Sequence, residues 1–195
     1  MIFIWESFLM GKLYWKPGNM LYPLPVVMVS VRDKDIDNII TVAWAGTINS
    51  DPAMLSISVR KERFSYEMLK NSGEFVVNLV TKDLAYACDY CGVASGRDVD
   101  KFRKMNLTKL ESKYVNAPSI KESPVNLECK IEYTQELGTH TIFMAKILGV
   151  TVDDKYMDES GRFNLNDSNL VTYSHGRYYT LGEELGKFGY SVKKK

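Results

Sequence analysis

Histidine and cysteine are scarce in this sequence of 195 residues, which contains two histidines and three cysteines. An odd number of cysteines does not make a disulfide framework, which agrees with a reducing compartment. His140 and His175 stand outside any H-E-x-x-H or G-x-S-x-G motif, so no local pattern supports a zinc peptidase or a hydrolytic triad. The sequence therefore predicts neither a hydrolase nor a metal site.

Cys88 and Cys91 have C-x-x-C spacing, and three interpretations of this pair stay open. A zinc site usually needs two such pairs, but Cys129 stands alone in an expected strand. A catalytic dithiol would lie at a helix start, whereas Cys88 falls within an expected helix. The favoured interpretation is two small apolar residues at a helix end.

Neither sign of charge dominates, because 25 basic and 24 acidic residues give a net charge of +1. A nucleic-acid binder usually has a basic excess, so no nucleic-acid partner is expected. The basic run at 193–195 is interpreted as a solvated tail.

The apolar stretch 1–10 is too short to cross a bilayer and lacks the basic start and cleavage site of a signal peptide. It is interpreted as an N-terminal extension, or as residues upstream of a start at Met10. We expect no membrane partner and a cytoplasmic location.

Nucleotide-binding motifs are also missing. The sequence has no G-x-x-x-x-G-K-[ST] phosphate loop, and the glycines of 182–189 lack the strand–turn–helix context of a dinucleotide fingerprint. Neither a P-loop enzyme nor a Rossmann dehydrogenase is expected.

Length and composition favour one globular domain over 1–195, with a C-terminal tail at 154–195 that we expect to make dimer contacts.

Helices are expected at 65–73, with Ser65 as N-cap and Gly73 as the stop, and at 84–90, followed by a glycine-containing loop at 91–98. Residues 33–38 are expected to form a turn, and Gly138 to form a bend. Apolar alternation and turn residues predict strands at 26–31, 39–48, 54–60, 75–79, 127–137 and 141–152. Adjoining strands with few helices indicate a mainly β fold, an antiparallel barrel.

The stretch TVAWAGTINSDPAM, residues 41–54, is unusual for a strand. Trp44 stands among Ala43, Ala45 and Gly46, where a strand built only for the core would carry Val, Ile or Leu. Small side chains let a second flat object approach the backbone closely, so the stretch indicates a binding surface for a planar ligand.

Seven motifs in order resemble the flavin reductase-like family with an FMN-binding split barrel, in particular its flavoredoxin-type branch. They are N-I-I-T-V-A-W-A-G-T-I-N-S-D-P (38–52), S-V-R-K (58–61), G-E-F-V-V-N (73–78), C-G-x-x-S-G (91–96), V-D-K-F (99–102), E-S-P-x-x-L-E-C (122–129) and G-T-H-T-I-F (138–143). The match spans roughly 20–152, with a looser tail at 173–179.

The resemblance implies a homodimer of six-stranded Greek-key split barrels with one non-covalent FMN per subunit near the dimer interface. It implies an oxidoreductase that transfers hydride from NADH or NADPH to FMN and on to an acceptor. The alternative is an FMN-dependent electron-transfer protein without NAD(P)H reductase activity. A third hypothesis is a barrel that has lost flavin and binds haem or another planar ligand.

The same resemblance assigns site residues. FMN carries a phosphate, for which Arg60 and Lys61 beside Ser58 would be charge-assisted donors. Trp44 would lie against the flavin ring, and His140 is a candidate catalytic residue. The complete set of expected FMN-binding residues is Thr41, Val42, Ala43, Trp44, Thr47, Asn49, Ser50, Ser58, Val59, Arg60, Lys61, Ser65, Cys91, Gly92, Ser95, Lys101 and His140.

Each assignment has a purely structural alternative. Trp44 could be an ordinary core residue, Lys101 could lie on a solvated helix face, and His140 could be a surface histidine. Arg60 could pair with a nearby glutamate instead of a phosphate. The tail tyrosines, which are interpreted as packing or dimer contacts without chemistry, are Tyr173, Tyr178 and Tyr179.

Overall fold

A computed structural model describes residues 11–192 of the chain. The expected N-terminal extension at 1–10 and the basic run at 193–195 lie outside the described residues. Within the described part, every helix is too short or too polar to cross a membrane.

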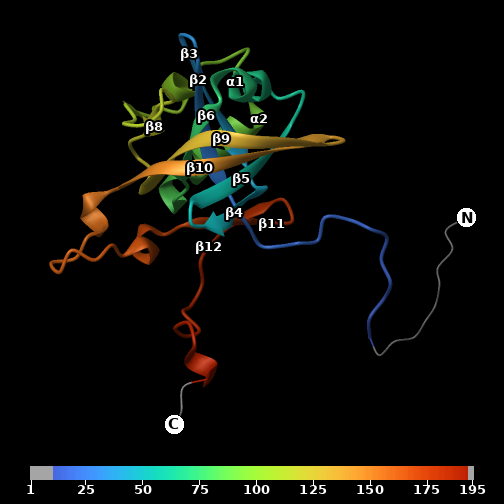
Figure 1. The fold of residues 1–195 in the computed structure, drawn as a ribbon. Helices are drawn as coiled ribbons and strands as arrows, with labels where there is room; N and C mark the ends of the chain where they lie inside the picture. The colour runs from blue at the N-terminus through green and yellow to red at the C-terminus, as the bar shows by residue number, and fades with distance from the viewer. Residues whose placement is uncertain (1–10, 193–195) are drawn as a thin grey trace, which may run out of the picture.

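Seven antiparallel strands form the main sheet, in the order β3-β2-β6-β9-β10-β5-β4 (Figure 1). The mainly β class with few short helices is confirmed, and the sheet has seven strands because the single strand expected at 39–48 forms two, β3 and β4. The strands are β2 (Val27–Asp33), β3 (Ile36–Val42), β4 (Ala45–Ser50), β5 (Ala53–Arg60), β6 (Glu74–Leu79), β9 (Val125–Leu137) and β10 (His140–Val152).

The expected strand at 39–48 is in fact two strands, because the chain breaks at Ala43 and Trp44. The backbone N–H of Ser58 donates to the carbonyl of Trp44 at 2.8 Å, so the break stays attached to β5. The expected turn at 33–38 shrinks to Lys34 and Asp35, since both flanking strands are longer than their apolar runs. Gly138 bends the β9–β10 hairpin with a φ of 64°, as expected.

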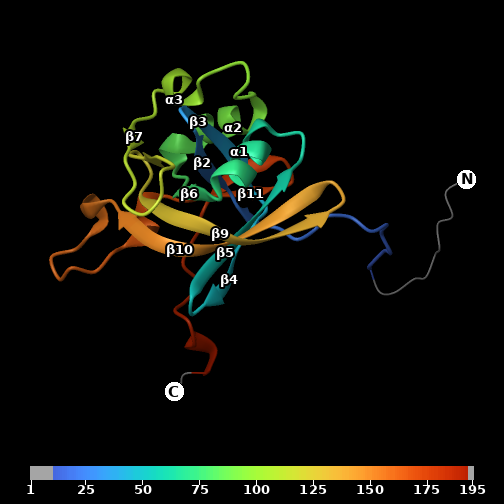
Figure 2. The same ribbon diagram turned by 45° about the horizontal axis from the view of Figure 1, so that its top comes forward.

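Alternation of side chains along the strands produces the principal core. In β5, for example, Leu55, Ile57 and Val59 are buried, and they pack with Phe75 and Phe143 from other strands. A strand directs every second side chain to one face, so this alternation fills the concave side of the curled sheet (Figure 2).

Three α-helices pack around the sheet: α1 (Phe64–Ser72), α2 (Ala85–Val93) and α3 (Lys101–Lys104). The expected N-cap at Ser65 is wrong, because Arg63 is the N-cap and Ser65 lies buried in the first turn of α1. Gly73 ends α1 in the left-handed conformation at φ 69°, as expected. Helix α2 runs three residues past the expected 84–90 and takes Cys91 out of the predicted loop.

A C-terminal hairpin, β11 (Val171–Ser174) and β12 (Arg177–Thr180), pairs with β1 (Leu24–Pro25) to form a small second sheet. Its two-residue turn is His175 and Gly176, both with positive φ, the conformation that tight hairpin turns require. The remaining short elements are β7 (Lys109–Leu110), β8 (Ser119–Ile120), and the 3-10 helices η1 (Lys82–Leu84), η2 (Asp154–Tyr156), η3 (Leu165–Ser168) and η4 (Tyr190–Val192).

Candidate functional site

A cleft of about 480 Å³ opens where β3 breaks before β4. The volume lies within the range of about 300–1,000 Å³ that is usual for small-molecule sites. Five segments meet around it: the β3 end, β5, the α2 end, the β10 start and the β11–β12 hairpin. Its lining is Val26, Ile40, Thr41, Val42, Ala43, Trp44, Ser58, Val59, Arg60, Arg63, Asp89, Gly92, Val93, His140, Tyr173, Gly176 and Tyr178.

Trp44 and His140 form one aromatic wall of the cleft. Their ring centroids are 4.4 Å apart with a tilt of 33° between the planes. Trp44 is 39% exposed, so it is not the core tryptophan of the structural alternative. Burial and the charge of Arg60 lower the pKa of His140, so the imidazole is mainly neutral at pH 7. This wall is aromatic and mainly uncharged at pH 7.

Where β3 meets α2, the cleft is lined by small side chains and backbone. The Thr41 hydroxyl donates to the carbonyl of Cys88, which ties β3 to α2. A Cβ at Gly92 would lie only 3.1 Å from the Cβ of Thr41, so any larger residue there would crowd this contact. The strand break and this close helix contact leave backbone and small side chains on this side of the cleft.

A second cavity of about 140 Å³ adjoins the cleft and shares Ile40, Arg63 and Val93 with it. It lies at the N-terminal end of α1, where unpaired backbone N–H groups favour an anion. Its complete lining is Asn38, Ile40, Glu62, Arg63, Phe64, Ser65, Val93, Ala94, Ser95, Gly96, Arg97 and Lys101. Three cations, two serine hydroxyls, a helix start and one acidic residue, Glu62, whose carboxylate pairs with Arg60, therefore surround one small space.

Lys101 is the most buried cation of this space, with 4% of its surface exposed, so it does not lie on a solvated helix face. Its Nζ donates to the carbonyls of Ile39 at 2.7 Å and Cys91 at 2.8 Å. Burial lowers the pKa of Lys101 to about 8. The ammonium has three N–H groups, so one remains after these two bonds.

Two arginines complete the basic end. Arg63 donates to the carbonyl of Gly92. The guanidinium of Arg97 lies 5.4 Å from the ring centre of Phe64, a cation–π contact. A Cβ at Gly96 would lie 2.2 Å from Oδ1 of Asn38, so this loop can pass so close only as glycine.

The expected phosphate donors are engaged elsewhere. Arg60 lines the cleft but pairs with Glu62 at 2.7 Å, one of the structural alternatives. Lys61 pairs with Glu136 at 2.5 Å and lies outside the lining of both cavities. Both pairs are more than 40% exposed and so add little stability.

Nine of the expected residues line the cleft, and they come from four motifs, which lie at the strand break, on β5, on α2 and on β10. They are Thr41, Val42, Ala43, Trp44, Ser58, Val59, Arg60, Gly92 and His140. Ser65, Ser95 and Lys101 line the smaller cavity instead. Thr47, Asn49 and Ser50 lie on the exposed edge strand β4, outside the lining of either cavity.

Sequence reasoning missed the residues that the C-terminal hairpin contributes. Tyr173 and Tyr178 line the cleft, with ring centroids 5.5 Å apart in an edge-to-face contact. The Tyr178 hydroxyl donates to Asp89 at 3.0 Å, which fastens the hairpin to α2. The aromatic cluster Y-S-H-G-R-Y-Y was the available signal. Arg63 and Arg97 were also missed, although Arg63 follows the Arg60–Lys61 pair closely.

The three cysteines are free and buried. Burial raises the pKa of Cys91 to about 11 and that of Cys88 to about 12, so both stay as thiols at neutral pH. Both thiols pack in the apolar cluster between β3 and α2. Across residues 11–192, three or more metal-ligating side chains do not come together at any point.

Comparison with known proteins shows which family and fold this chain is similar to. The profile of the "Flavin reductase like domain" matches residues 19–182. Flavoredoxin of Desulfovibrio vulgaris (Miyazaki F) is 30% identical with a TM-score of 0.86, over 93% of this chain and 100% of that one. Flavoredoxin from Methanosarcina acetivorans is 27% identical with a TM-score of 0.84, over 93% and 99%.

A protein of Archaeoglobus fulgidus without an assigned function is 34% identical over 160 residues, 82% of this chain and 89% of its own. The profile match covers the strand break, both cavities and the C-terminal hairpin. The chain belongs to the flavin reductase like domain family.

Proposed function

We propose that this protein is an FMN-dependent oxidoreductase, in which non-covalently bound FMN takes hydride from NADH or NADPH and passes electrons to an acceptor. One observation carries the proposal: a cleft with an aromatic wall of Trp44 and His140 at the β3 break adjoins a small cavity that gathers Arg63, Arg97 and Lys101. A ligand with a planar ring at one end and a phosphate at the other matches both. The names of the two flavoredoxins support a flavin as that ligand.

The residues present fit FMN. The ring would lie in the cleft against Ala43 and Trp44, where small side chains and an indole leave room for a plane. The phosphate would lie in the smaller cavity, where α1 begins and where Arg63 and Lys101 are held by backbone carbonyls. Such pre-positioned donors bind phosphate with charge-assisted hydrogen bonds. A haem could also pair its two propionates with these cations, so the absorption spectrum separates the ligands: bound flavin gives a blue band, and bound haem gives a Soret band.

The protein's own residues bind and orient. Lys101 is mainly charged at pH 7 and supplies a buried positive charge close to the cleft. His140 is mainly neutral there and presents a flat face to Trp44 without adding charge to this wall. Tyr173 and Tyr178 on the hairpin limit the space on the other side, so a second planar ligand would enter between the hairpin and Trp44.

The test is anaerobic stopped-flow absorbance of the FMN-reconstituted protein after mixing with NADH or NADPH. Rapid bleaching of the blue flavin band supports hydride uptake from the nicotinamide. Bound FMN that dithionite bleaches but neither nucleotide does would overturn the reductase activity and leave the electron-transfer alternative. Absence of FMN binding would reject both.

We further propose that the working form is a homodimer, in accordance with the resemblance. Leu13, Trp15, Leu21 and Phe188 are each at least 78% exposed, so these large apolar side chains are accessible to a second copy of the chain. Light scattering after size exclusion measures this directly, since a dimer has twice the 22.3 kDa of one chain. The cytoplasmic location and the redox partner stay predictions.

A further inference from the structure

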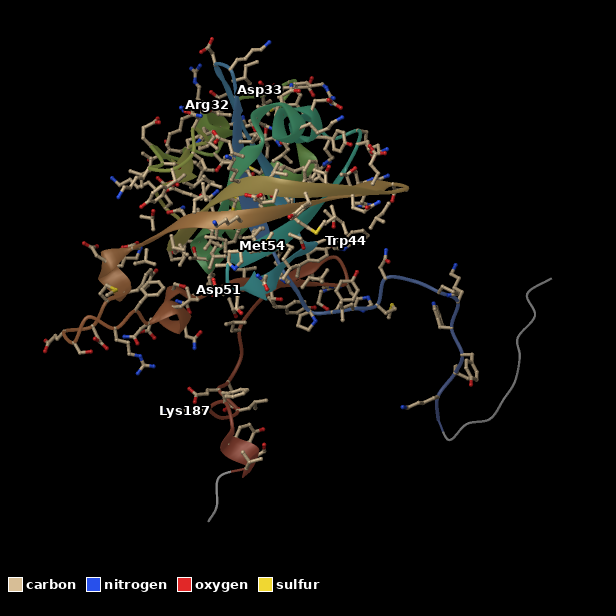
Figure 3. All side chains as sticks on the ribbon, viewed as in Figure 1. Arg32, Asp33, Trp44, Asp51, Met54 and Lys187 are labelled. Atoms are coloured by element: carbon tan, nitrogen blue, oxygen red, sulfur yellow. The ribbon has the colours of Figure 1, made fainter. Side chains whose placement is uncertain are left out.

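The segment 181–192, here called the tail, extends away from the rest of the protein (Figures 1 and 2). Its backbone hydrogen bonds within residues 11–192 are local, from Tyr190 to Lys187 and from Val192 to Gly189. Figure 3 places Lys187 well apart from the sheets. The tail is nevertheless apolar at regular intervals, with Leu185 85%, Phe188 107% and Val192 81% exposed.

A groove that matches this tail lies beside the cleft. It has a volume of about 520 Å³, between the arm at 18–24 and the start of β4. The lining is largely apolar: Gly18, Asn19, Met20, Leu21, Tyr22, Leu24, Trp44, Ala45, Gly46, Ser56 and Ser58. A Cβ at Gly46 would meet nothing within 4 Å, so the floor of the groove is open.

We propose that the tail of a second copy of this chain lies in this groove, with Leu185 and Phe188 against the arm and Trp44. The inference rests on the dimer of the proposed function and names the contact that makes it. Each Leu or Phe side chain that leaves water on burial stabilises the contact through the hydrophobic effect. A groove with open apolar walls and a tail with exposed apolar residues on the same chain can satisfy one another reciprocally in a two-fold dimer.

The second copy is a better occupant than the chain's own tail. The tail leaves β12 and points away from the body, whereas the arm leaves β1 on another side (Figure 1). Strand β4 is an edge of the main sheet and is paired only with β5. An exposed edge next to an apolar groove is the kind of surface that natural proteins cover.

The contact has a consequence for the cofactor site. Trp44 and Ser58 line both the groove and the cleft. A tail in the groove would therefore contact Trp44 from the groove side, while the ring of His140 lies 4.4 Å from the indole on the cleft side. In this arrangement Phe188 is a positioning residue for the Trp44 wall of the partner's cleft.

Cross-linking between copies tests the proposal. Cys88, Cys91 and Cys129 are fully buried, so introduced surface thiols dominate the reaction with a short bismaleimide. Chains with Met20→Cys and chains with Phe188→Cys, each with its own tag, are coexpressed and purified through both tags. The matched control replaces Phe188→Cys by Tyr86→Cys, a side chain of α2 that is 78% exposed.

We expect at least fivefold more cross-linked dimer for the Met20–Phe188 pair than for the Met20–Tyr86 pair. Equal yields would overturn the inference, as would failure to recover any species that carries both tags. A double variant, Met20→Cys with Phe188→Cys in one chain, reveals the other occupant. A looped single-chain product at high dilution would mean that the chain's own tail fills the groove, and this also overturns the inference.

The emission of Trp44 gives an independent readout. In a Trp5→Phe, Trp15→Phe background, Leu185→Ala with Phe188→Ala should raise acrylamide quenching of Trp44 at least twofold. Lys187→Ala, in the same tail, should leave it unchanged. Unchanged quenching in the double alanine variant would overturn the inference. Loss of FMN binding with intact cross-links would instead reject the proposed function and leave this contact standing.

Discussion

The two ends of the site are built in opposite ways. At the basic end, Lys101 is buried and its ammonium is held by two backbone carbonyls, and Arg63 is held by a third. At the ring end, Trp44 is 39% exposed and is contacted mainly by another side chain, His140. One end is fixed before any ligand arrives, and the other is open. An anchor that recognises phosphate and a surface that admits a second reactant need these different properties.

We expect the largest effect from substitutions at the basic end of the site, here called the anchor, which consists of Arg63, Arg97 and Lys101. Arg63→Ala together with Arg97→Ala should weaken FMN binding at least 100-fold, because each lost charge-assisted bond costs about 1.5–3 kcal/mol. Riboflavin, which has no phosphate, should lose less than threefold. Isothermal titration of both ligands measures the difference. Equal losses for the two ligands would mean that the phosphate does not lie in the smaller cavity.

Arg60→Ala together with Lys61→Ala is the matched control. Both side chains form exposed ion pairs, with Glu62 and Glu136. FMN affinity should fall less than fivefold in this variant. A larger loss than in the Arg63 and Arg97 variant would return the phosphate to Arg60 and Lys61, the assignment made from the sequence.

Gly96 lies in the loop that lines the smaller cavity, and any side chain there should destabilise the fold. A Cβ there would lie 2.2 Å from Asn38 and 2.7 Å from Phe64, so Gly96→Ala should lower the free energy of unfolding by about 1–3 kcal/mol. Gly46→Ala meets nothing within 4 Å and should change it by less than about 0.5 kcal/mol. Urea denaturation measures both. A neutral Gly96→Ala would show that the anchor is more adaptable than its packing indicates.

The charge of Lys101 makes the anchor sensitive to pH. Its pKa is lowered to about 8, so above pH 8 the free protein loses a positive charge that the phosphate needs. The phosphate of FMN is already doubly charged there, since its second pKa is about 6. FMN affinity should therefore fall between pH 8 and 9.5, while riboflavin affinity stays level. Fluorescence titration measures both, and Lys101→Met should remove the pH dependence.

The lowered pKa of Lys101 should decrease FMN affinity as the pH rises, but it should increase the free energy of unfolding. Between pH 8 and the ordinary lysine pKa of 10.5, the unfolded chain holds the Lys101 proton and the folded chain does not. The contribution of Lys101 to the free energy of unfolding therefore rises with pH in this window. Urea denaturation across pH 8–10 should show this rise in the protein and a smaller one in Lys101→Met. A fall with pH that Lys101→Met abolishes would contradict the assigned shift.

The sequence predicted the elements better than the site. Alternating apolar residues predicted most main strands, because a half-buried strand must alternate. The break at Trp44 was missed, since small residues are compatible with a continuous strand and the break depends on contacts with β5 and α2. The pairing of Lys61 with Glu136 joins residues 75 positions apart, which local pattern cannot anticipate. Tyr173 and Tyr178 reach the cleft through the β1–β11 pairing and the bond from Tyr178 to Asp89, which both join residues far apart in the sequence.

Substitutions at the open end are expected to have a smaller effect than those at the anchor. Trp44→Leu removes the indole but keeps an apolar side chain, so FMN and riboflavin should each lose about threefold to tenfold in affinity, by the same factor. The reason is that Trp44 would contact the ring, which both ligands share, while the phosphate donors are untouched. Trp44→Phe keeps a flat face and should lose less than threefold. Fluorescence titration of the two flavins measures these ratios. A loss confined to FMN would mean that Trp44 acts on the phosphate end, and the contrast between a fixed anchor and an open ring surface would no longer hold.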